Sequence, residues 1–256
     1  MFDLQLSLEP PIARMVINRP ERRNAMSDAM WRTLAKFCAD IEACEAIKAV
    51  IVEGADGHFC AGADISEFDT LFADLDNARR YLHSIEASLN ALAFLDRPTA
   101  AKVEGFCMGG GLAIALACDF RLAGESAQLS VPPAKLGLLY GVAETRLLVE
   151  TVGPSAAKDL LFSGRRLDAR EALNMGLVNG VVADGELDSA IERQAQLWTR
   201  LSGASIRGAK KAVRATLAGQ EKDVRTLLEK VALGADFREG RAAFREKRAP
   251  DFLSRA

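Results

Sequence analysis

The sequence contains few histidines and no paired cysteines. Only two histidines, His58 and His83, occur among its 256 residues, and the five cysteines are odd in number. A zinc site built from several histidines is therefore not expected, and neither histidine lies near the elbow pattern of a Ser/His/Asp triad. Unpaired cysteines are typical of a reducing compartment. We expect a cytoplasmic protein without a bound metal.

Excess charge and long apolar runs are also lacking. Lys and Arg number 33 against 35 Asp and Glu, which gives a formal net charge of −2. Such a balance does not favour nucleic acid or a membrane surface as a partner. No uncharged run approaches the length that spans a bilayer, and residues 1–4 do not resemble the start of a secretory signal. We expect a globular chain with 49% hydrophobic residues and one large core.

Phosphate-binding signatures are missing. No P-loop is present, and the glycine triplet Gly109–Gly111 does not have the spacing of a dinucleotide fingerprint. An ATP-dependent or nicotinamide-dependent enzyme is therefore disfavoured, and we predict no separate cofactor.

Hydrophobic patterning predicts an α/β chain. Strands are expected at 4–8, 12–17, 49–52, 99–103, 120–123, 128–131 and 178–182. Helices are expected from Ser27 to about residue 44, at 81–95, 112–118, 142–152, 155–162 and 169–175, and from 187 onward with breaks near 202, 219 and 234. Residues 67–76 show no clear period and are expected to be mobile. The division is an α/β core over residues 1–190 and a helical region over 191–256.

The glycine triplet stands between an apolar run, 99–103, and the uncharged run 112–118. Glycines at a strand-to-helix joint allow close approach of a ligand, because no Cβ intervenes. The helix start leaves N–H groups unpaired at the positive end of the helix dipole. Such a joint suits an anion, or an oxygen that becomes one during a reaction. A tight turn that packs helix on strand is the alternative.

Seven motifs occur together in a characteristic order. They are Asn18-Arg19-Pro20, Asn24-Ala25-Met26, Phe59-Cys60-Ala61-Gly62-Ala63-Asp64-Ile65, Met108-Gly109-Gly110-Gly111, Ala117-Cys118-Asp119, Met175-Gly176-Leu177-Val178 and Ala243-Phe244-Arg245-Glu246-Lys247-Arg248. In this order and spacing, over nearly the whole chain, the sequence resembles the enoyl-CoA hydratase/isomerase (crotonase) superfamily.

The resemblance implies a spiral of strand-strand-helix units and a C-terminal helical region that assembles homotrimers, often paired into hexamers. It implies an acyl-CoA thioester as ligand, with its oxygen bound by two backbone N–H groups. The matching positions are Ala63 and Gly110. Two preset donors would stabilise the enolate oxygen that forms when charge develops at the thioester α-carbon.

The resemblance also implies contacts to the CoA moiety. Arg22 or Arg23 would meet a phosphate, and the backbone around Ala61, Ala63 and Ile65 would meet the adenine. On a neighbouring subunit, Phe244 and Lys247 would contribute. The charged side chains among these are equally compatible with solvated surface positions.

The sequence departs from the hydratase pattern at two positions. Hydratases of the superfamily use two glutamates, and the corresponding residues are Ala113 and Pro133. Neither can transfer a proton, so the mechanism that needs both carboxylates lacks its residues.

Two side chains are candidates for the missing acid or base. Tyr140 stands where methylmalonyl-CoA decarboxylases of the superfamily have a tyrosine, although these also carry a histidine where this chain has Ala63. Glu144, near a helix start, is the second candidate, and stabilisation by the helix dipole is its alternative role. Three hypotheses remain open: a hydratase/isomerase-like enzyme with non-standard residues, a decarboxylase or other C–C enzyme using Tyr140, and a non-catalytic acyl-CoA binding protein.

Overall fold

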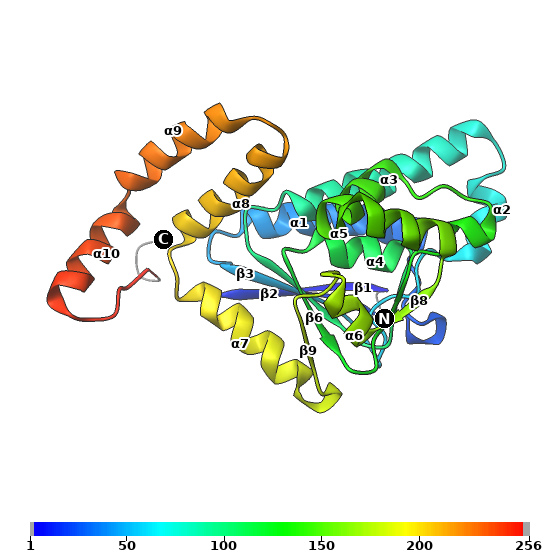
Figure 1. Ribbon diagram of the computed structural model, residues 1–256, viewed down its shortest axis with the longest axis horizontal. Helices are drawn as coiled ribbons and strands as arrows, with labels where there is room; N and C mark the ends of the chain where they lie inside the picture. The colour runs from blue at the N-terminus through cyan, green and yellow to red at the C-terminus, as the bar shows by residue number, and fades with distance from the viewer. Residues whose placement is uncertain (1–2, 253–256) are drawn as a thin grey trace.

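A six-stranded sheet forms the centre of the computed structural model, which describes residues 3–252 (Figure 1). The spatial order is β1-β2-β3-β4-β6-β9, and every pair is parallel except the β1–β2 hairpin. The strands are β1 (Leu4–Glu9), β2 (Ile12–Ile17), β3 (Ala49–Gly54), β4 (Thr99–Val103), β6 (Phe120–Gly124) and β9 (Gly180–Val182). The predicted hairpin and the mixed α/β class are confirmed.

The sheet is buried on both faces. In β3, Val50 and Val52 belong to the larger core, whereas Ala49 and Ile51 belong to the core on the other face. This alternation follows from the pleat, which points successive side chains to opposite faces. It explains why the strand is a continuous apolar run rather than an alternating one.

Helices cover both faces of the sheet (Figure 1). The larger core lies under α1 (Asp28–Ala43), α3 (Leu75–Ala93), α4 (Gly110–Ala117) and α5 (Val142–Ser163), which is kinked at Gly153. The hydroxyl of Ser27 caps α1 as predicted, accepting from the Met30 amide.

On the opposite face, α7 (Leu187–Thr199) packs Leu187, Ile191 and Ala195 against the sheet. The division predicted at residue 190 therefore falls inside α7, a helix that packs on the sheet.

A second, three-stranded sheet carries the glycine joint. Its order is β5-β7-β8, formed by β5 (Phe106–Met108), β7 (Gln128–Ser130) and β8 (Arg166–Asp168). The strand that leads into α4 is thus β5 and not the predicted run at 99–103. β8 has the sequence Arg-Leu-Asp with one apolar residue, and β5 directly precedes the glycine triplet, so neither forms the apolar run by which the equally short β7 and β9 were predicted.

The segment at 67–76, expected to be irregular, is largely helical. Asp64 accepts from the Ser66 amide and begins η2 (Ile65–Glu67), which continues into α2 (Phe68–Leu71). Asp74 then caps α3, which starts six residues earlier than predicted. Ile85, Leu89 and Leu92 form the buried face of α3, whereas Leu82 is exposed.

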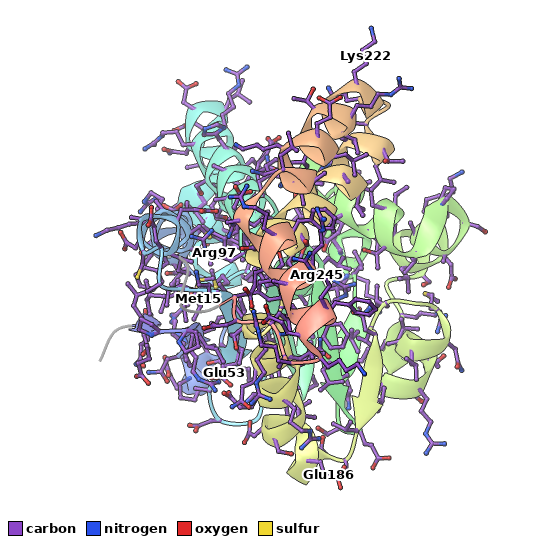
Figure 2. The ribbon with its side chains drawn as sticks, turned by 90° about the vertical axis from the view of Figure 1, so that its left-hand side faces the viewer. Met15, Glu53, Arg97, Glu186, Lys222 and Arg245 are labelled. Atoms are coloured by element: carbon purple, nitrogen blue, oxygen red, sulfur yellow. The ribbon has the colours of Figure 1, made fainter. Side chains whose placement is uncertain are left out.

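The chain ends in helices that extend from the body (Figure 1). They are α8 (Gly203–Leu217), α9 (Glu221–Ala232) and α10 (Ala235–Glu246), with breaks where the sequence predicted them. Figure 2 turns the left-hand side of Figure 1 towards the viewer. In this view α10, with Arg245, lies in front, and Lys222 at the start of α9 points away from the body. The remaining elements are α6 (Ala169–Asn174), η1 (Pro20–Arg22), η3 (Pro133–Leu136) and η4 (Asp184–Glu186). Within residues 3–252, every helix is too short or too polar to cross a membrane.

Candidate active site

The glycine triplet turns the chain from β5 into α4. Gly109 has φ 50° and ψ −116°, a conformation that favours glycine. Gly111 is required for a different reason, because a Cβ there would lie 2.3 Å from the Cys60 carbonyl oxygen. Gly110 begins α4, and its N–H has no acceptor among residues 3–252. The first amide of a buried helix is therefore available to a ligand.

The segment 60–64 lies between β5 and residues 23–26. On one side, Cys60 donates to the Phe106 carbonyl and accepts from the Met108 amide. On the other side, Met26 accepts from the Asp64 amide and donates to the carbonyl of residue 62. This pairing holds the loop beside the glycine joint.

Gly62 directs the Ala63 amide towards that joint. The amides of Ala61 and Asp64, three residues apart, both donate towards residues 23–26. In a regular strand the N–H groups alternate in side, so this spacing requires an interruption. Gly62, with φ 109°, provides it. The N–H of Ala63 faces the opposite side, and it has no acceptor among residues 3–252.

The two unpaired amides lie close together. A Cβ placed on Gly110 would be 3.7 Å from the Ala63 nitrogen. Two neighbouring backbone donors, one at the N-terminus of a buried helix, can stabilise an oxyanion. Because both belong to the backbone, the arrangement does not depend on side-chain rotamers.

The amides open into an apolar cavity of about 290 Å³. Its walls come from residues 61–72, from α3, and from the segment between β7 and α5. The lining residues include Trp31, Ala61, Ala63, Ile65, Phe68, Phe72, Tyr81, Leu82, Ile85, Gly110, Pro133, Leu136, Leu138, Leu139, Tyr140 and Glu144. Six predicted site residues are therefore brought together: Ala61, Ala63, Ile65, Gly110, Tyr140 and Glu144.

Glu144 is the only carboxylate in the lining of this cavity within the described residues. It is the third residue of α5, and its side chain folds back over Gly141, so the carboxylate lies beside the backbone at the start of the helix. Burial raises the pKa of the carboxyl above its ordinary value, and the negative charge of Glu86 raises it further. A carboxyl with a raised pKa in a cavity is suited to accept and return a proton.

Tyr140 lines the cavity, but its hydroxyl donates to the Gly109 carbonyl at 2.9 Å. Burial, followed by the charges of Glu144 and Cys107, holds the pKa of the phenol well above its ordinary range. The side chain therefore braces the glycine joint as a neutral hydrogen-bond donor.

Other predicted residues lie outside the cavity. Arg22 and Arg23 are exposed, and the Arg23 guanidinium lies 5.2 Å from the ring centroid of Phe106. Phe244, 86% exposed, lies on α10, and Lys247 follows as the C-terminal cap of that helix. Neither residue lines the cavity, and α10 lies at the opposite end of the ribbon from α2, which contributes to the lining (Figure 1).

The two residues that the resemblance places at the hydratase glutamate positions differ in their surroundings. Pro133 lines the cavity, whereas Ala113 is buried in α4. Trp31 and Tyr81 also line the cavity and were missed. In the sequence, both are aromatic residues within helical apolar patterns, and nothing distinguishes them from core residues.

No cluster of metal ligands occurs among residues 3–252. Burial raises the pKa of the thiols of Cys38, Cys60 and Cys118 to about 12, so they are unreactive at neutral pH.

Comparisons with known proteins show similarity over nearly the whole chain. The family model described as enoyl-CoA hydratase/isomerase matches residues 8–255. The mouse enoyl-CoA hydratase domain-containing protein 2, mitochondrial, is 34% identical over 256 residues, covering 95% of this chain and 85% of that protein.

Solved structures show the same fold. An enoyl-CoA hydratase/isomerase family protein from Hyphomonas neptunium superposes with a TM-score of 0.95 and 38% identity, over 98% of this chain and 97% of that one. An enoyl-CoA hydratase/carnithine racemase from Magnetospirillum magneticum superposes with a TM-score of 0.92 and 36% identity, over 98% and 96%.

Proposed function

Because the chain belongs to the enoyl-CoA hydratase/isomerase family, we propose that it transfers a proton on an acyl-CoA thioester through an enolate. The two convergent amides of Ala63 and Gly110 carry this proposal. They would donate to the thioester oxygen as it gains negative charge. In a buried site each such donor contributes about 3–4 kcal/mol to transition-state stabilisation.

Glu144 is the proposed acid and base. A single carboxylate suits isomerisation, because one group removes a proton and returns it elsewhere. Glu144 would take a proton from carbon 2 of a 3-enoyl-CoA, leaving a dienolate whose oxygen is held by the two amides. The protonated Glu144 would then deliver the proton to carbon 4, giving the 2-enoyl-CoA and regenerating the carboxylate.

Hydration of a 2-enoyl-CoA is the second candidate function. The mouse relative is named for a hydratase domain. Glu144 would then act alone, since Ala113 and Pro133 occupy the positions of the usual pair.

Decarboxylation through Tyr140 has less support. The phenol already donates to Gly109, and within the described residues no Lys, Arg or His lines the cavity. A leaving carboxylate would instead meet Glu144. The non-catalytic reading is weakened by the same buried carboxyl, because a binding protein does not need one.

We also propose that the CoA moiety extends to Arg22 and Arg23 and reaches Phe244 and Lys247 of another copy. The C-terminal helices expose Val213, Leu217, Leu228, Leu233 and Phe244, an apolar surface suited to self-association as a trimer or hexamer. Light scattering after size exclusion measures this directly. A monomer at micromolar concentration would contradict the shared site.

Four assays distinguish the functions. Conversion of 3-hexenoyl-CoA to the conjugated 2-enoyl thioester is followed as a gain of absorbance, and hydration of crotonyl-CoA as a loss. Binding of butyryl-CoA is measured by calorimetry. The proposal predicts binding and the gain of absorbance. Binding without either reaction would favour the non-catalytic protein, and release of CO₂ from methylmalonyl-CoA would favour the decarboxylase.

A further inference from the structure

Two buried polar atoms in the cavity have no partner. Neither the Trp31 indole Nε1 nor the Tyr81 hydroxyl makes a hydrogen bond among residues 3–252. Trp31 is fully buried, Tyr81 is 3% exposed, and both line the cavity. Buried polar groups in proteins are nearly always paired, so two orphans in one cavity indicate a ligand with a matching group.

The two side chains are held rigidly. The Tyr81 ring packs edge-on against Phe68 and Phe72, with centroids 6.4 and 5.8 Å away. Trp31 is fixed by the buried face of α1. Rigid donors bind with little loss of side-chain entropy, which is a property of built recognition sites.

The pair lies near the end of the cavity where the thioester would be held. The indole Cζ2 of Trp31 is 3.0 Å from the position that a Cβ on Gly110 would occupy. Since the nitrogen belongs to the same indole, a ligand group that reaches it would be close to the carbonyl end of an acyl chain.

Both groups can donate at neutral pH. The indole nitrogen is a donor only, whereas a phenol both donates and accepts. Burial raises the pKa of Tyr81. The nearby Trp31 indole, which is too poorly placed for a hydrogen bond, partly offsets that rise, and the carboxylates of Glu67, Asp28 and Glu144 increase it. The phenol therefore remains protonated.

We propose that Trp31 and Tyr81 form a subsite for one neutral oxygen, a hydroxyl or a carbonyl, carried by the acyl group. This inference rests on the proposed function and specifies its substrate class as oxygenated acyl-CoA. A neutral oxygen fits because both groups can donate to it and Tyr81 can also accept from a hydroxyl. An anionic group does not fit, since among the described residues the only charged side chain in the lining is the acidic Glu144.

Calorimetric titration with matched ligands tests the subsite. Butyryl-CoA, 3-hydroxybutyryl-CoA and 4-hydroxybutyryl-CoA are each added to the native protein and to Tyr81→Phe and Trp31→Phe. One hydroxyacyl-CoA should bind on the order of tenfold more tightly than butyryl-CoA to the native protein. Tyr81→Phe should remove this preference, so that within this variant the hydroxyacyl-CoA binds no more tightly than butyryl-CoA.

Two controls keep the result interpretable. Ser84→Ala, one turn further along α3, removes a hydroxyl outside the cavity lining and should keep the preference. Thermal unfolding shows whether Trp31→Phe is folded. If Trp31→Phe does not fold, Tyr81→Phe still tests the subsite, because phenylalanine keeps the packed ring.

The failures are distinguishable. If butyryl-CoA and both hydroxyacyl-CoAs bind the native protein equally, the subsite is refuted and the proposed function stands. If the three ligands bind the native protein equally but Tyr81→Phe loses enoyl-CoA turnover, Trp31 and Tyr81 would hold a bound water instead. That result would also refute the acyl-oxygen subsite. If no acyl-CoA binds, both proposals fail.

Discussion

Tyr140 and Gly109 are joined by a hydrogen bond of 2.9 Å from the phenol to the backbone carbonyl. The same carbonyl accepts from the Ala113 amide at 3.0 Å within the first turn of α4. The Gly109 carbonyl and the Gly110 N–H belong to the same peptide group, so both hydrogen bonds fix the orientation of that N–H. Tyr140 therefore orients the amide of Gly110 through the carbonyl on its opposite side.

Tyr140→Phe tests this supporting role. The change removes one hydrogen bond, so the free energy of unfolding should fall by about 0.5–1.5 kcal/mol. The turnover rate should fall by about tenfold or less, while the pH at which activity rises stays unchanged. Urea unfolding and pH–rate profiles measure both effects. A loss of activity as large as that of Glu144→Gln would instead make Tyr140 the proton-transfer group.

Gly110→Ala tests the paired amides. The new Cβ would lie 3.0 Å from Trp31 and 3.7 Å from the Ala63 nitrogen, inside the space of the bound oxygen. The turnover rate should fall by about 10²–10³-fold, as when one oxyanion donor is lost. Gly185→Ala is the matched control, because nothing lies within 4 Å of its Cβ position. Equal activity of both variants would place the oxyanion site elsewhere.

The pH dependence follows from Glu144. Its carboxyl must be ionised to accept a proton, and burial raises its pKa, so activity should rise at a higher pH than for an exposed glutamate. Glu86 increases this pKa by charge repulsion. Glu86→Gln should therefore move the rising limb to lower pH with little change in the plateau rate. If the pH at which activity rises is the same in Glu86→Gln as in the native protein, the titrating group is not Glu144.

The ionic contact between the sheet and α7 yields a stability prediction. Lys102 lies 2.7 Å from both Glu53 and Asp188, with only 12% of its side chain exposed. Lys102→Met leaves Glu53 poorly paired, and the free energy of unfolding in urea should drop by about 1–3 kcal/mol. Lys211→Met breaks the more exposed pair with Asp96 and should cost about 0–1 kcal/mol. A larger loss of unfolding free energy in Lys211→Met than in Lys102→Met would mean that the Lys102 ion pairs do not stabilise the packing of α7 on the sheet.

The sequence predicted the parts of the fold that have long or strongly patterned elements. The sheet strands, the capped helix at Ser27 and the C-terminal breaks were read correctly because patterning and caps are local. Strands β5 and β8 were not found, since neither lies in an apolar run bounded by turn residues, as the equally short β7 and β9 do. The helices at 67–76 were missed because their packing on Tyr81 comes from distant contacts.

The candidate site divides in a similar way. Resemblance to a family suggested Ala63 and Gly110, but the turn at Gly62 that directs the Ala63 amide depends on a backbone angle that no residue pattern specifies. Tyr140 and Glu144 were both candidates, and three-dimensional contacts were needed to separate them. The phenol is bonded to the backbone behind the site, whereas the carboxylate lies in the cavity with a raised pKa.

The rate of 3-hexenoyl-CoA isomerisation by Glu144→Gln is the most direct test of the proposed single acid and base. Glutamine keeps the shape but cannot carry a proton, so the turnover rate should fall by about 10²–10⁴-fold while butyryl-CoA still binds. Glu150→Gln, an exposed carboxylate on the same helix, should retain the native rate. Native turnover by Glu144→Gln would contradict the account.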